Sequence, residues 1–165
     1  QTDPRARALV LGVAAPARPR PASRRPTSPV EASAYVAAAD VWPGVAIVLH
    51  LRGLRLVNVA NAREHWSTRK RRVTREHAAV NAAVRLAPMW STVAAAEARR
   101  WVVTITREGR GLLDDDGLAI SAKGVRDAVA AALGVDDGPT GPVTWRYEQR
   151  RAKGYAVEVR VEVAK

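Results

Sequence analysis

One segment near the end of the chain alternates between apolar and charged residues, and it constrains the fold more than any other feature. Its apolar side is formed by Tyr155, Val157, Val159, Val161 and Val163. Its other side carries Glu158, Arg160 and Glu162. A period of two is typical of a β-strand with one buried face. We therefore expect a strand over residues 155–163, joined through a hairpin loop at residues 151–154 to a strand at residues 143–149.

Earlier segments predict two more strands and two helices. Residues 45–56 alternate and shift phase at Gly53, which indicates a bulged strand. Residues 62–86 have the period of an amphipathic helix, and residues 101–105 alternate as a further strand. The helical period returns at Leu118, Ala122, Val125, Val129 and Leu133. The expected order is β-α-β-α-β-β, a small α/β (α+β) domain with a mixed sheet and two main helices, the second ending at Gly134.

The first 43 residues differ in composition from the rest. They hold seven of the ten prolines and show no hydrophobic period. We interpret residues 1–43 as a mostly disordered basic tail and residues 44–165 as the folded domain. The apolar run at residues 8–15 is short for a secretory signal and is followed by Pro16, so secretion is not favoured. No apolar run is long enough to span a membrane.

Charge is distributed unevenly along the chain. The formal net charge of +11 indicates a polyanionic partner, usually nucleic acid. Residues 45–110 carry a net charge of +9, whereas residues 111–141, here called the acidic segment, carry −4. All carboxylates of the acidic segment are aspartates: Asp114, Asp115, Asp116, Asp127, Asp136 and Asp137. Such clustering costs repulsion unless a cation binds there.

The first aspartates of the acidic segment suit a hard metal ion. Mg²⁺ takes oxygen ligands, and Asp114 and Asp116, two residues apart at the end of an extended segment, can face one site. A carboxylate-bound Mg²⁺ in a basic surround suits phosphodiester hydrolysis, because the ion activates water and stabilises charge at phosphorus. Lys123 lies seven residues after Asp116, on the same helix face, where it can approach the phosphate. The chain has no cysteine, which excludes thiolate-bound metals and thiol catalysis.

Other interpretations of the aspartates stay open. Asp116 can be a helix N-cap, with Asp114 and Asp115 favouring the helix dipole, which is the commonest reason for aspartate at such a place. An EF-hand loop fails, because its first and twelfth positions would be Leu112 and Lys123. The three histidines have no metal-ligand spacing, and we interpret them as structural.

Three short blocks follow one another across the acidic segment. They are residues 113–118 (LDDDGL), 122–128 (AKGVRDA) and 133–138 (LGVDDG), with 145–149 (WRYEQ) downstream. Together they resemble the RusA family of Holliday junction resolvases, particularly its phage-borne members. Upstream, residues 61–66 (NAREHW) resemble that family's Asn-containing N-terminal segment. The resemblance covers roughly residues 45–163, close to a whole family domain.

The resemblance implies a RusA-like, homodimeric endonuclease that depends on Mg²⁺, or Mn²⁺ in its place, and nicks four-way DNA junctions symmetrically. By position, the family's catalytic and metal-binding aspartates fall on Asp114, Asp116 and Asp137, and its catalytic lysine falls on Lys123. Family members usually have Asn directly after the last aspartate of the triplet, whereas this chain has Gly117. Glycine lacks the amide that can order the aspartate or cap the helix, and it loosens the backbone at the metal site.

The length of the second helix bears on Asp137. A straight helix over residues 118–133 would be about 24 Å long and would hold Asp137 away from Asp116. Two chains packed antiparallel about a two-fold axis would place the start of one helix beside the end of the other. Asp137 is therefore expected to complete the partner's site, unless the helix is shorter than its period suggests.

The helix at residues 62–86 carries cations on its first turns. They are Arg63, Arg69, Lys70, Arg71, Arg72 and Arg75. Their single sign favours contacts with DNA phosphates, and a solvated helix face is the alternative. Membrane binding is less favoured, because the apolar face of this helix is narrow and rich in alanine. Trp145 and Tyr147 share one face of their strand, and we interpret them as core or dimer packing.

The sequence thus predicts a structure-selective endonuclease that resolves branched DNA in recombination and repair, in the cytoplasm of a bacterial or phage-infected cell. The alternative is a non-catalytic branched-DNA-binding protein of the same fold, in which the Gly117 site no longer cleaves. An unrelated basic RNA-binding protein is disfavoured, because it does not explain the acidic segment.

Overall fold

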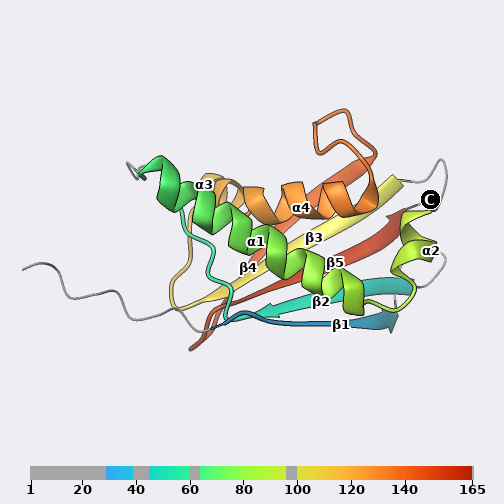
Figure 1. Cartoon of the computed structure of the whole chain (residues 1–165), viewed down its shortest axis with the longest axis horizontal. Coiled ribbons are helices and arrows are strands. Elements are labelled where there is room, and N and C mark those ends of the chain that lie inside the picture. Colours follow the sequence, from blue (N-terminus) through green and yellow to red (C-terminus); the bar gives the residue numbers. More distant parts are fainter. Residues whose placement is uncertain (1–28, 39–44, 60–63, 96–99, 165) are drawn as a thin grey trace, which may run out of the picture.

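The computed structural model describes residues 29–38, 45–59, 64–95 and 100–164. Within these ranges the strands form one sheet in the order β1-β2-β5-β3-β4. The strands are β1 (Glu31–Ala38), β2 (Val45–Arg52), β3 (Arg100–Gly109), β4 (Val143–Arg151) and β5 (Ala156–Ala164). The helices are α1 (Trp66–Leu86), α2 (Trp90–Ala94), α3 (Asp115–Ser121) and α4 (Lys123–Leu133). The expected small α/β domain with a mixed sheet is confirmed, and Figure 1 shows α1 and α4 side by side over one face of that sheet.

The core lies between the sheet and these two helices. Along β5, every second residue from Val157 to Val163 is buried, as the alternation predicted. Val80 of α1 and Val129 of α4 are fully buried in the same cluster. Burying one such side chain contributes about 1.5–3 kcal/mol, so the apolar period of each element accounts for its place in the fold.

Strand β1 corrects the expected boundary of the folded domain. Residues 31–38, assigned from the sequence to a disordered tail, pair antiparallel with β2, so that Glu31 lies opposite Arg52 and Ala38 opposite Val45. The prediction is wrong for these residues, because the backbone groups at the edge of β2 find partners there that composition does not reveal. Residues 1–28 and 39–44 lie outside the described residues.

The expected hairpin between β4 and β5 and the expected bulge at Gly53 are not found. β4 and β5 do not form a hairpin, because β3 lies between them and pairs parallel with β4 and antiparallel with β5. The link at residues 152–155 passes the end of β3, where the Ala152 N–H donates to the Gly109 carbonyl at 2.9 Å. Gly53 does not bulge a longer strand: it has a φ of +81° and begins a turn where β2 ends.

The expected helix over residues 118–133 is two helices. α3 begins three residues earlier than expected, and the chain turns at Ala122 before α4 begins at Lys123. The pair forms the crossover between the parallel strands β3 and β4. Among the described helices, none has both the length and the apolar character needed to cross a bilayer.

Candidate functional site

Asp114 is the N-cap of α3. It follows the loop after β3, and its Oδ1 accepts a hydrogen bond from the Gly117 N–H at 3.1 Å. Asp115 and Asp116 occupy the first turn of α3 and are exposed. Negative side chains at a helix N-terminus are stabilising, so these aspartates help to form the helix. The capping role considered for Asp116 belongs to Asp114.

The loop that carries Asp114 is held by two side chains from neighbouring strands. Gln149 of β4 makes two hydrogen bonds with the backbone of Leu113, at 2.7 and 2.8 Å. Arg107 of β3, which is buried, donates to the Gly111 carbonyl at 2.7 Å. The carboxylate of Asp114 therefore follows directly on a backbone position that is fixed to the sheet.

Gly117 is buried against Asn58. A Cβ at residue 117 would overlap both the amide nitrogen of Asn58 and Oδ1 of Asp114. The missing side chain thus leaves the space in which the Asn58 amide lies beside the capping carboxylate. The amide that lies next to the Cβ position of residue 117 therefore comes from the segment after β2.

Asp137 returns to the first turns of α4 in its own chain. Its Oδ2 accepts a hydrogen bond from Arg126 at 2.7 Å and lies 3.9 Å from Nζ of Lys123. Lys123 also pairs with Asp127 at 3.0 Å. Burial acts to raise the pKa of Asp137, but the hydrogen bond and charge of Arg126, together with a hydrogen bond from Asp127 and the charge of Lys123, outweigh it, and the pKa lies below the ordinary value of 3.8. The break at Ala122 shortens the helix enough for this return, which agrees with the shorter-helix alternative.

The expected metal ligands do not converge. Carboxylate oxygens suit Mg²⁺ in kind. Yet within the described ranges no group of three or more His, Cys, Asp and Glu side chains is placed to hold a metal ion. Asp114 caps α3, Asp116 is exposed on the first turn of that helix, and Asp137 is held by Arg126. The structure brings Lys123 and Asp137 together, whereas the three aspartates do not form one ligand group within the described residues.

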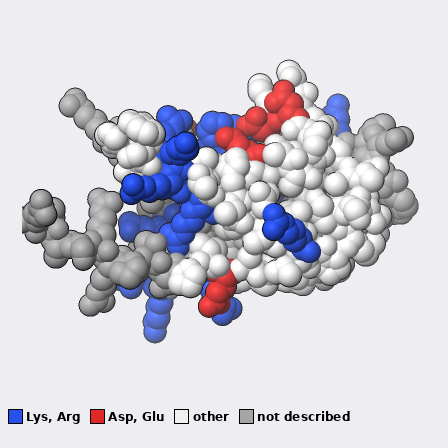
Figure 2. All heavy atoms as spheres, viewed as in Figure 1, with Lys and Arg blue, Asp and Glu red and all other residues white. Residues whose placement is uncertain are grey.

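Some cationic side chains on the first turns of α1 are exposed, and others are bound to groups within the protein. Arg69, Lys70 and Arg71 are exposed. Arg72 and Arg75 are half-buried, and Arg75 donates to the Gly53 carbonyl at 3.5 Å. The remaining expected phosphate contact, Arg63, lies outside the described residues. In Figure 2 the blue atoms gather at the end of the molecule where α1 begins, and red atoms lie over α4 and the loop that follows it.

Arg72 is used inside the protein. It bridges Glu64, at 3.0 Å, and Glu76, at 3.2 Å. Glu76 is only 1% exposed, and a Cβ at Gly124 of α4 would overlap its Oε2. Burial raises the pKa of the Glu76 carboxyl, and the nearby charge of Arg72 only partly opposes this rise. Glu76 therefore packs α1 against the start of α4, a role that its helical position alone does not reveal.

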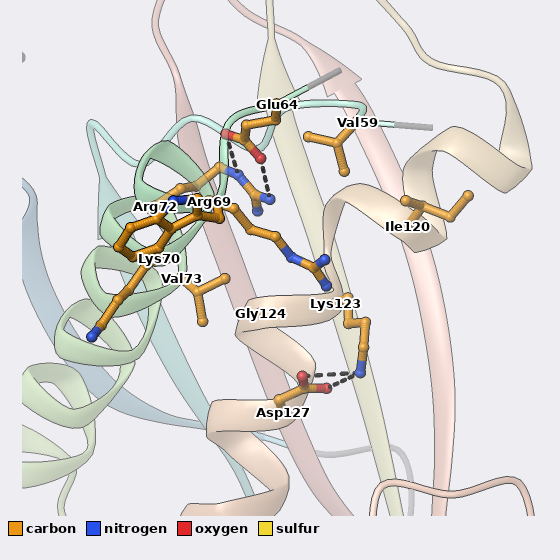
Figure 3. Close-up of a pocket in the computed structure, with 11 residues that line it drawn as sticks. Val59, Glu64, Arg69, Lys70, Arg72, Val73, Ile120, Lys123, Gly124 and Asp127 are labelled. Carbon is orange, nitrogen blue, oxygen red and sulfur yellow. Dashed lines mark hydrogen bonds and ion pairs between the residues drawn. The ribbon is translucent and has the colours of Figure 1, made fainter. Parts of the chain in front are cut away.

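A pocket of about 570 Å³ lies between the first turns of α1 and the junction of α3 and α4. Figure 3 shows Arg69 extending from α1 toward this junction, where Lys123 points to Asp127. Trp66, Val73 and Ile120 are among the apolar residues that line it. The pocket links the basic helix to the lysine that sequence reasoning had singled out.

Sequence reasoning missed four residues that shape this region: Asn58, Glu76, Arg126 and Gln149. Gln149 and Arg126 do fall within the blocks that carry the family resemblance, so their positions were marked but their roles were not. Asn58 and Glu76 had no such signal. Asn58 lies against Gly117, 59 residues away in the chain, and Glu76 lies against Gly124, 48 residues away. These contacts exist only because the chain crosses over between β3 and β4.

Comparison with models of protein families, with curated proteins and with solved structures finds no match for this chain.

Proposed function

We propose that this protein is a Mg²⁺-dependent, structure-selective endonuclease that acts on branched DNA as a homodimer, as the resemblance to RusA resolvases implies. One observation carries the proposal: Lys123, 3.9 Å from Asp137, lines the same pocket as Arg69 of the basic helix. A lysine beside a carboxylate and next to exposed cations is an arrangement suited to binding and polarising a phosphodiester.

The protein's own residues would divide the work. The exposed Arg69, Lys70 and Arg71 would hold the DNA backbone without reading sequence. Lys123 would neutralise charge that develops on the scissile phosphate. Asp116, exposed one turn before the pocket residue Ile120, would accept a proton or order a water molecule. We assign no step to the metal ion, because the three aspartates expected to hold it do not converge.

Cleavage of a synthetic four-way junction tests the proposal. The protein should produce paired nicks in the junction only when Mg²⁺ is present, and should leave linear duplex of the same sequence intact. Asp116→Asn and Lys123→Ala should abolish nicking. Asp115→Asn is the matched control, because Asp115 is exposed on the same helical turn but has no role implied by the resemblance. Nicking that survives Asp116→Asn, or that needs no Mg²⁺, would contradict the proposal.

A second candidate is a branched-DNA-binding protein that does not cleave. It is favoured by the engagement of two expected ligands within the chain, since Asp114 caps α3 and Asp137 is bound by Arg126. In this case the junction should bind more tightly than duplex at equal salt, with no nicking in either Mg²⁺ or Mn²⁺. The same assay therefore separates the two candidates.

A further inference from the structure

The pocket beside α1 combines an exposed aromatic side chain with cations. Trp66, the first residue of α1, lines it and is 69% exposed, the largest exposed fraction among the described large apolar residues. Its ring centre lies 5.7 Å from that of His65, whose Nδ1 accepts a hydrogen bond from the Ser67 N–H and caps the helix. The tryptophan is thus attached to a capped, regular helix start.

The lining of the pocket has a positive balance. It includes four cationic and two anionic side chains: Arg69, Lys70, Arg72, Lys123, Glu64 and Asp127. Glu64 is neutralised by Arg72, and Asp127 is paired with Lys123. Within the part of the chain that the structure describes, Arg69 has no ion pair, and Figure 3 shows its side chain directed across the pocket toward α4. A ligand that carries both an aromatic ring and a negative charge complements this surface.

We propose that this pocket binds one unpaired nucleotide of a DNA strand, with the base against Trp66 and the adjoining phosphate between Arg69 and Lys123. The proposal rests on the proposed function for its choice of DNA, and it adds a site that reads whether a base is unpaired. A volume of about 570 Å³ falls in the ordinary range of small-ligand sites, about 300–1,000 Å³. A paired base inside a duplex cannot reach Trp66, whereas a base at a branch point can leave the stack at modest cost.

Such a pocket would link branch recognition to the lysine. Base stacking on an aromatic side chain tolerates any base, because each base has a π-face. The cations next to it act on the phosphate and not on base identity. A nucleotide held by both groups would place its phosphate beside Lys123, so selection of unpaired DNA would need no contact with base edges.

Short oligonucleotides test the pocket without any cleavage. Binding of a fluorescent thymidine tetramer is compared with that of a tetramer of abasic sites, which keeps the phosphates, in buffer with chelator. The intact protein should bind the thymidine tetramer about 10-fold more tightly. Trp66→Ala should bring this ratio close to one, and Trp66→Phe should keep most of it. Tyr35→Ala is the control, because Tyr35 is an exposed aromatic residue on β1 outside the pocket lining, and it should leave the ratio unchanged.

The outcomes separate this inference from the proposed function. Three results would overturn the proposal that the pocket binds an unpaired nucleotide. The first is an affinity ratio near one for the intact protein, and the second is no measurable binding of either tetramer at millimolar concentration. The third is an affinity ratio that is unchanged by Trp66→Ala. Junction nicking measured in parallel then reports on the endonuclease alone. A Trp66-dependent preference for the thymidine tetramer without junction nicking would support nucleotide binding in the pocket and would contradict the proposed endonuclease activity. Thermal unfolding of each variant should match that of the intact protein, since the replaced rings are exposed.

Discussion

Gln149 forms two hydrogen bonds with Leu113: its amide nitrogen donates to the Leu113 carbonyl at 2.7 Å, and its oxygen accepts from the Leu113 N–H at 2.8 Å. The Gln149 side chain therefore satisfies both the N–H and the carbonyl of Leu113, as the backbone of a neighbouring strand would. Gln149→Ala should lower the free energy of unfolding by about 1–3 kcal/mol, because it leaves both backbone groups without these partners. Amide hydrogen exchange at Leu113 should accelerate, and this is the direct measurement.

A nearby replacement provides the control for Gln149. Thr144 is exposed on the same strand, and Thr144→Ala should change the free energy of unfolding by less than about 0.5 kcal/mol. Junction nicking, if present, should fall in Gln149→Ala and not in Thr144→Ala, because Asp114 follows Leu113. Unchanged exchange at Leu113 in Gln149→Ala would show that the two hydrogen bonds do not hold the loop.

Gly117 should resist replacement even by alanine. The new Cβ would overlap the Asn58 amide and the Asp114 carboxylate, so Gly117→Ala should destabilise the protein by about 1–3 kcal/mol in denaturant unfolding. Removing the obstacle with Asn58→Ala should recover part of this loss, giving a coupling of at least about 0.5 kcal/mol. Gly111→Ala is the matched control: no atom lies within 4 Å of its Cβ position, and a neutral or slightly stabilising effect is expected. Additive effects of the Gly117 and Asn58 changes would argue against the contact.

Neighbouring arginines of α1 should behave differently. Arg71 is exposed, and Arg71→Ala should leave stability unchanged while lowering the slope of log binding constant against log salt by about 0.9. Arg72 holds Glu64 and the buried Glu76, so Arg72→Ala should cost about 3 kcal/mol of stability. Thermal unfolding and salt-dependent DNA binding, measured on both variants, check the distinction. Equal effects of the two variants on stability would contradict it.

The buried carboxyl of Glu76 should make stability depend on pH. Burial raises its pKa above the ordinary value of 4.5, with smaller contributions from Glu64 and Asp127, against the charge of Arg72. The native state therefore keeps a proton that the unfolded chain releases, and stability falls as the pH rises from 4.5 through the raised pKa. Glu76→Gln has no such proton, so its stability relative to the intact protein should increase over this pH range.

Chemical denaturation at several pH values measures the effect of Glu76. Because the charge of Arg72 lowers the pKa of Glu76, the fall in stability should extend to higher pH in an Arg72→Ala background. A stability difference between Glu76→Gln and the intact protein that stays constant with pH would show that Glu76 is ionised in the native state as readily as in the unfolded chain.

The central strands were predictable because their burial is periodic. Val157 to Val163 alternate, and the alternating residues Trp101, Val103 and Ile105 of β3 are buried in the same way. In β2, Ile47, Leu49 and Leu51 are buried as their spacing predicted, and Ala46 and Val48 between them are buried as well. The sequence could not show which strands would be neighbours: a short link between two strands normally makes a hairpin, and here β3 lies between them. β1 was missed because the inward side of its alternation consists of small alanines, Ala32 and Ala34, which follow a proline-rich segment, and pairing with β2 decides its conformation.

The break between α3 and α4 at Ala122 could not be predicted, because the helical spacing of apolar residues continues across it. Leu118, Ala122 and Val125 keep the helical spacing across a turn of one residue, so period alone does not distinguish two helices from one. Lys123 and Asp137 were predicted as site residues, but their approach depends on that turn. Gln149 lies 36 residues from Leu113, and contacts of this kind arise only once the sheet has formed.

The pairing of β1 with β2 also sets a practical limit on shortening the chain. If residues before 44 were removed, as the composition of that region invites, β2 would become the edge of the sheet and would expose a row of backbone donors and acceptors. Edges of this kind recruit strands from other molecules. Recombinant versions that begin after Ala38 should therefore aggregate, whereas those that retain Glu31 and the residues after it should remain dispersed.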